Sequence, residues 1–222
     1  LKDGIGWGFK DGTVRYAGTS TASLVTIDTS PAPPSRAFGH DGFVVWPVRG
    51  AGSSQIRGYR PGGTTETYAI EADVIVSAAL SKERLCWIRG RGPDAELGKF
   101  DAAELRVSTR PASPGDVAAT SSPALPAQFG LSDLQVGGDF AATIGQPADN
   151  STSKLIVVQL STMKMWTLKG RTMDWLNAVF AVSADGGEIL VGATDAPGTY
   201  GNEVRRLYRL KTSALTDLAK GW

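Results

Sequence analysis

Residues 182–191 of the chain read VSADGGEILV, and residues 206–211 read RLYRLK. In the first stretch an apolar segment runs into a turn with aspartate and glycine, and a second apolar segment leaves it. Short apolar segments joined by such turns are typical of antiparallel β-hairpins. The two stretches together therefore predict a hairpin followed by a third strand.

The same strand–turn–strand unit occurs about five times along the chain. Its turns contain Asp11-Gly12, Asp41-Gly42, Lys82-Glu83, Gly138-Asp139 and Asp185-Gly186. The predicted third strands are 23–28, 55–59, 96–100, 155–160 and 206–210, and the predicted fourth strands are 66–70, 105–108, 165–168 and 215–218. The first unit lacks a fourth strand, because the prolines of residues 31–34 cannot donate ladder hydrogen bonds.

This repeat predicts an all-β fold, because no stretch of about 11 residues shows clean helical spacing. We expect a β-propeller of about five four-stranded blades in one domain, 1–222, with an exposed loop at 111–128. The strand at Ile5–Phe9 is expected to pair with the last blade and close the ring, since a ring must protect its last edge. The alternative is a β-sandwich, or two small β domains divided at that loop.

Residues 182–191 with 206–211 are similar to a blade of the TolB-like propellers, and they share the general pattern of WD40-like blades. Those blades often have a serine, a small residue, an Asp-Gly turn, an apolar strand and then an aromatic–aliphatic strand. The resemblance implies a propeller that serves as an interaction scaffold more often than as an enzyme. It assigns a role to no residue of this chain.

Composition excludes several functional classes. The 222 residues include 23 Lys and Arg against 22 Asp and Glu, so charge gives no reason to expect nucleic acid or an anionic membrane as partner. No apolar run approaches the roughly 20 residues that span a bilayer. The single cysteine, Cys86, lies in an apolar strand and is expected to be buried, and with one histidine the chain has no nitrogen–sulfur zinc site.

The beginning of the chain and its loops suggest a compartment. The chain lacks an initiator methionine, which indicates processing or a longer parent sequence, and its loops are rich in Ser, Thr and Gly. We therefore expect an extracytoplasmic location.

Aromatic and arginine side chains are the candidate ligand-binding residues. Trp46 and Trp87 occupy matching positions in the second and third units, and Tyr16 comes close to the same place in the first; Arg49, Arg89 and Arg91 follow them. The aromatic rings either pack between blades or form a stacking platform for a sugar or peptide at the channel mouth. In the second case the arginines supply donors to an acidic or carbonyl-rich partner.

Carboxylates at the turns are the candidate metal ligands, namely Asp11, Asp41, Glu83, Asp139 and Glu188. Gathered at one channel mouth they could bind Ca²⁺ or act as a glycosidase pair, although tight turns prefer these residues on conformational grounds alone. His40 is interpreted as a polar turn residue, because no Gly-x-Ser-x-Gly motif accompanies it.

Three functions remain open at this point. The favoured one is a non-catalytic binding module for a protein or glycan partner, with no catalytic residue assigned. The alternatives are a glycosidase-like enzyme that uses the turn carboxylates, and a purely structural domain.

Overall fold

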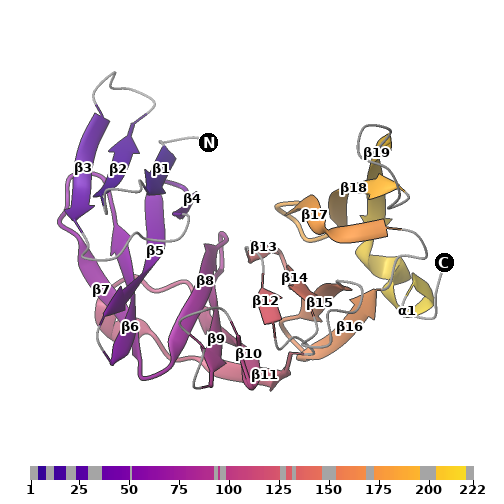
Figure 1. Ribbon diagram of the computed structural model, residues 1–222. Helices are drawn as coiled ribbons and strands as arrows, with labels where there is room; N and C mark the ends of the chain where they lie inside the picture. Colours follow the sequence, from indigo (N-terminus) through magenta and orange to yellow (C-terminus); the bar gives the residue numbers. More distant parts are fainter. Residues whose placement is uncertain are drawn as a thin grey trace.

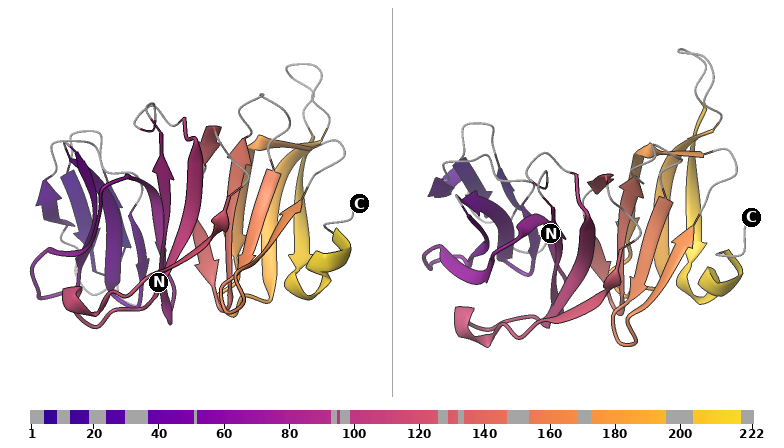
Figure 2. Two further views of the ribbon diagram at one scale, coloured as in Figure 1. Left: turned by 90° about the horizontal axis from the view of Figure 1, so that it is seen from below. Right: turned by 60° about the horizontal axis from the view of Figure 1, so that its bottom comes forward.

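The described part of the chain forms five antiparallel sheets that follow one another in sequence order. The computed structural model describes residues 5–8, 13–18, 24–29, 37–50, 52–92, 95, 99–125, 129–131, 134–146, 154–168, 173–195 and 204–218. Figure 1 shows the sheets arranged along an arc, and Figure 2 shows them standing side by side. We refer to them as sheets A to E.

In sheets A, B, C and E each strand pairs with its neighbours in sequence order. Sheet A contains β1 (Ile5–Gly8), β2 (Thr13–Ala17) and β3 (Leu24–Thr29). Sheet B contains β4 (Phe38–His40), β5 (Phe43–Gly50), β6 (Ser53–Tyr59) and β7 (Glu66–Glu71). Sheet C contains β8 (Val74–Leu80), β9 (Arg84–Arg91), β10 (Ala102–Thr109) and β11 (Thr120–Ala124).

The last two sheets continue this order. Sheet D contains β12 (Phe129–Leu131), β13 (Gln135–Gly137), β14 (Phe140–Gln146), β15 (Lys154–Gln159) and β16 (Lys164–Leu168). Sheet E contains β17 (Met173–Val182), β18 (Glu188–Asp195) and β19 (Val204–Lys211). Short helices are η2 (Pro114–Asp116), η3 (Thr212–Ala214) and α1 (Leu215–Leu218).

The turn chemistry explains the hairpins. Between β4 and β5, Asp41 has φ 47° and Gly42 has φ 71°. A two-residue hairpin turn of type I′ needs a positive φ at both central positions, which Asp-Gly provides at little cost. The predicted repeat of strand, turn and strand is confirmed in sheets B to E; residues 11 and 12, at the first turn, lie outside the described residues.

Four hydrophobic cores lie between successive sheets, from A/B to D/E. In the inner sheets a central strand is buried on both faces, as at Leu85–Ile88 of β9 and Leu155–Val158 of β15. In β18, by contrast, Ile189 and Val191 are buried while Leu190 between them is 41% exposed. One face of sheet E is therefore covered by sheet D and the other face is open.

Several predicted boundaries are wrong. The third strand of sheet C is β10, which includes the predicted fourth strand 105–108; the predicted third strand, 96–100, lies in the β9–β10 connection, where residues 96–98 are not described. The true fourth strand is β11, inside the predicted exposed loop 111–128. Residues 215–218, predicted as a strand, form α1, because Leu215 turns back into the D/E core.

The predicted ring closure is not found among the described strands. β1 pairs with β2 in sheet A, and no described strand joins it to sheet E. Sheets A and E therefore stand at the two ends of the arc (Figure 1).

Candidate functional site

The predicted aromatic platform is buried between sheets. Trp46 is 0% exposed, and its indole Nε1 donates to Oδ2 of Asp28, on β3 of the preceding sheet, at 3.0 Å. Arg57, the cross-strand neighbour of Trp46, donates from Nη1 to both oxygens of the same carboxylate at 2.9 and 3.0 Å. Trp46 therefore joins sheet B to sheet A.

The same arrangement recurs one sheet further along. Trp87 is 1% exposed, and its Nε1 donates to Oε1 of Glu71, on the last strand of sheet B, at 2.9 Å. Arg106, the cross-strand neighbour of Trp87, has its Nε 3.3 Å from the same oxygen. We call each set, Trp46–Arg57–Asp28 and Trp87–Arg106–Glu71, an inter-sheet clasp.

These clasps correct the platform interpretation. Both tryptophans pack between sheets, where a neighbouring sheet covers the ring faces that a ligand would need. Tyr16, predicted at the same place, is 5% exposed and contacts Tyr59 with ring centroids 5.4 Å apart. The matching sequence positions reflect a repeated packing role.

The three predicted arginines have different surroundings. Arg89 contacts Glu104, Glu71 and Asp73. Burial lowers its pKa, but the hydrogen bonds and charges of Glu104 and Glu71 outweigh that effect, and the net pKa is raised. The guanidinium is therefore held in an ion-pair network.

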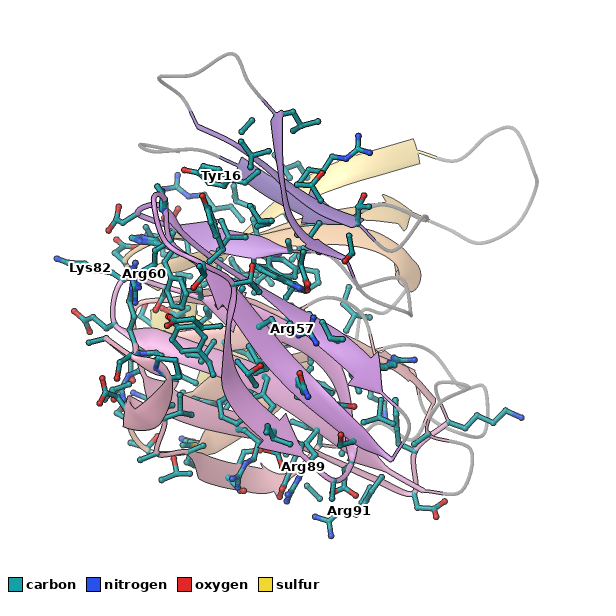
Figure 3. The ribbon with its side chains drawn as sticks, turned by 90° about the vertical axis from the view of Figure 1, so that its left-hand side faces the viewer. Tyr16, Arg57, Arg60, Lys82, Arg89 and Arg91 are labelled. Atoms are coloured by element: carbon teal, nitrogen blue, oxygen red, sulfur yellow. The ribbon has the colours of Figure 1, made fainter. Side chains whose placement is uncertain are left out.

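The other two arginines differ in exposure. Arg91, beside Arg89 in Figure 3, is 53% exposed and lies 3.6 Å from Asp73 and 3.7 Å from Glu104. Arg49 is half-buried near the end of β5. Of the three, Arg91 is the most accessible to a partner.

The turn carboxylates do not converge. Asp41 lies 3.1 Å from His40 Nδ1, Asp139 accepts from Ser161 N at 2.8 Å, and Glu188 accepts from Arg209 Nε at 2.6 Å. Glu83 is exposed at its own turn, and Asp11 lies outside the described residues. In the described part of the chain, no group of three or more His, Cys, Asp or Glu residues could hold a metal ion.

Cys86 is 0% exposed in the core between sheets C and D. Burial raises the pKa of its thiol to about 12, so the side chain is a neutral hydrophobic group at physiological pH.

Arg110 is a contact residue that the sequence did not indicate. Its Nη2 donates to the carbonyl of His40 at 2.9 Å, and its Nη1 lies 3.3 Å from the carbonyl of Ser81. Burial, followed by the nearby charge of Arg60, lowers its pKa. Arg110 therefore ties the first turn of sheet B to that of sheet C.

The open face of sheet E carries the second feature that sequence reasoning missed. Of the five exposed large hydrophobic residues among those described, four lie on the terminal sheets: Leu24 and Val25 on sheet A, Leu190 and Leu207 on sheet E. Leu207 is the most exposed, at 73%. The sequence does contain a sign of this exposed strand. Residues 204–211 read VRRLYRLK, a strongly basic stretch in which apolar and polar residues show little regular alternation.

A shallow hollow of about 320 Å³ lies at the end of this face. It is lined by Ser183, Asp185, Gly187, Glu188, Arg209, Lys211 and Ser213. The carboxylate of Asp185 is already engaged by Ser183 Oγ at 2.6 Å and Gly187 N at 2.9 Å. A polar hollow therefore lies beside the exposed leucines of sheet E, Leu190 and Leu207.

Comparison with solved structures supports the architecture. TolB from Acinetobacter baumannii aligns with a TM-score of 0.64 and 10% identity over 95% of this chain and 51% of that chain. A chain of a nidogen/laminin complex gives 0.60 and 11%, covering 94% and 80%, and Kuenenia stuttgartiensis hydrazine synthase gives 0.61 and 10%, covering 91% and 58%. The chain thus spans about half the length of the TolB chain.

These likenesses and the five successive sheets define the protein as having a β-propeller-type fold, as the sequence predicted. No family model and no curated protein matches the chain. In the described residues, no helix has the length and hydropathy needed to cross a membrane.

Proposed function

We propose that this protein is a non-catalytic protein-binding module whose contact surface is the open face of sheet E. We define this terminal surface by Leu190, Leu207, Arg209 and Lys211, with the hollow that adjoins them. The observation that carries the proposal is the exposure of two leucines on a sheet whose other face packs against sheet D. Exposed apolar groups beside arginine are typical of binding surfaces.

The arrangement on β18 and β19 supports this choice. Leu207 lies opposite Gly192, and Leu190 lies opposite Arg209. Glycine presents no side chain over Leu207, so the leucine stands clear of the sheet. An apolar centre with a charged margin has the anatomy of a protein interface.

The alternatives have less support. Trp46 and Trp87 are buried, which leaves a glycan no stacking platform at these two positions. The four described turn carboxylates lie at the turns of four different sheets, and two of them, Asp139 and Glu188, are engaged by Ser161 and Arg209.

A display experiment tests the proposed function. A phage library of protein segments is selected on the purified chain, and binders are compared on Leu190→Asp/Leu207→Asp and on the control Ile70→Asp. Ile70 is 67% exposed, but it lies on sheet B. We expect at least about tenfold weaker binding to the double variant and no change with the control. Equal binding to all three proteins, or binders selected only from a glycan array, would contradict the proposal.

We also propose an extracytoplasmic location, on the loop composition of the chain. Fractionation of the source cells with an antibody against this chain tests it. Recovery of the protein in the cytoplasm would contradict it.

A further inference from the structure

The outer edge of sheet E is unpaired in the described part of the chain. β19 pairs with β18 along its whole length, and no described strand pairs with its other side. Sheets B, C and D each continue to one further strand, β7, β11 and β16. Sheet E is therefore one strand short of its neighbours.

None of the described strands of the chain fills this position. After β19 it enters η3 and α1, and Leu215 packs into the D/E core. Figure 1 shows α1 near β16 and away from the strands of sheet A. β1, predicted to occupy the vacant position, pairs with β2.

The edge has the chemistry of a recognition strand. β19 reads VRRLYRLK, with four basic residues, no acidic residue and no proline. The Leu207 side chain is 73% exposed and the Arg209 side chain 67%. An exposed strand edge presents a row of backbone N–H and C=O groups to which another extended segment can pair.

Two basic side chains lie close to one carboxylate at this edge. Arg209 forms an ion pair with Glu188 at 2.5 Å, and Glu188 is also the cross-strand neighbour of the exposed Lys211. Glu188 is therefore paired with Arg209 and is the strand neighbour of Lys211, while Asp185 nearby is engaged by its own turn. A further carboxylate placed beside Lys211 and Arg209 gains favourable electrostatic energy.

We propose that the free edge of β19 binds an extended acidic segment of a partner protein as a fourth strand of sheet E. This inference rests on the proposed function and specifies the partner. Because side chains alternate along a strand, residues opposite Lys211, Arg209 and Leu207 occupy every second position. The recognised segment therefore has the order acidic, any, acidic, any, apolar, read in either chain direction.

Charge also distinguishes this partner from a second copy of the chain. Pairing two β19 strands would place two basic, acid-free segments side by side, and like charges opposite one another destabilise a sheet. An acidic segment replaces that repulsion with attraction. Strand addition supplies affinity through backbone hydrogen bonds, and the alternating side chains supply specificity.

The test uses a labelled synthetic peptide of about ten residues, a length suited to β19. It has glutamate, glutamate and valine at alternate positions, with threonine between them. Fluorescence anisotropy measures binding to the whole chain, and hydrogen exchange follows the β19 amides. We expect binding that weakens with salt, and slower exchange in β19 when peptide is bound.

Matched controls separate strand addition from simple charge attraction. Arg209→Glu/Lys211→Glu is expected to weaken binding at least about tenfold, whereas Lys164→Glu, on the last strand of sheet D, leaves it unchanged. A peptide with proline in place of threonine keeps the glutamates but loses backbone donors, and it should not bind.

Three results would overturn the inference: no binding, equal binding of the proline peptide, or unchanged exchange in β19. If segments from the display library bind the leucine face while the β19 amides stay unprotected, the proposed function stands and strand addition is wrong. If those segments bind elsewhere but the acidic peptide protects β19, the edge is a separate site.

Discussion

The inter-sheet clasp between sheets B and C can be measured by a double-mutant cycle of Glu71→Gln and Trp87→Phe. Trp87 Nε1 donates to the Glu71 carboxylate at 2.9 Å, and both side chains are buried. Phenylalanine removes the donor and keeps an aromatic ring, and glutamine keeps the shape of glutamate but removes its charge. Glu71→Gln changes the hydrogen bond with little change in volume. Trp87→Phe also leaves a cavity, but the cost of that cavity is common to both sides of the cycle and cancels from the coupling energy.

The expected magnitude follows from the contacts. A hydrogen bond to a charged group contributes about 1.5 to 3 kcal/mol, so we expect a coupling energy of about 1 to 2 kcal/mol. Glu71→Gln alone should cost about 2 to 3 kcal/mol, because Arg89 and Arg106 also lose their charged partner. These arginines are 21% and 23% exposed, so water screens part of that loss.

Urea unfolding followed by far-ultraviolet circular dichroism gives the four free energies without depending on Trp87 fluorescence. Asp28→Asn with Trp46→Phe is the matched cycle in the preceding clasp and should show coupling of similar size. A coupling below about 0.3 kcal/mol in both cycles would refute the clasp, since independent sites add within that range.

Three further predictions concern packing, pH and thiol reactivity. Gly137→Ala should lower the Tm by roughly 6 to 12 °C, because a Cβ there would lie 1.9 Å from Ser183 O and force sheets D and E apart; Gly115→Ala, which meets open space, should not. The hydrogen bond from Ser183 and then that from Gly187 lower the pKa of Asp185, so its stabilisation is present above the unfolded pKa of about 4 and is lost as pH falls through the lower folded value. Asp185→Asn should therefore reduce the Tm more at pH 7 than in acid below about pH 4, and equal loss at both would contradict this. Cys86 should react with a thiol reagent only as fast as the chain unfolds, given its full burial and its pKa of about 12; rapid labelling of the folded protein would contradict the packing.

Local features of the chain were sufficient to predict the hairpins. Asp41-Gly42 supplies the positive φ angles of a tight turn, and apolar runs such as Leu155–Val158 match strands buried on two faces. Both signals act over a few residues, so they are readable without tertiary information. Repetition of the unit then indicated the propeller-type fold.

The candidate site was less accessible to sequence reasoning. An aromatic at a repeated position is equally compatible with a ligand platform and with packing between sheets. Trp87 was assigned its role by Glu71 on the preceding sheet, a contact across 16 positions of the chain. In the same way, the sequence of residues 215–218 is compatible with a strand. The segment forms α1 instead, and Leu215 packs in the D/E core.

The amino-acid sequence by itself determined the strands, their turns and their repetition, because backbone conformation and apolar patterning are local properties of the chain. Only the tertiary structure decided which faces became buried and which edge stayed free, because burial depends on which sheet lies against which. The packing of neighbouring sheets buries Trp46 and Trp87. Among the described strands, β19 pairs only with β18, so its outer edge stays free.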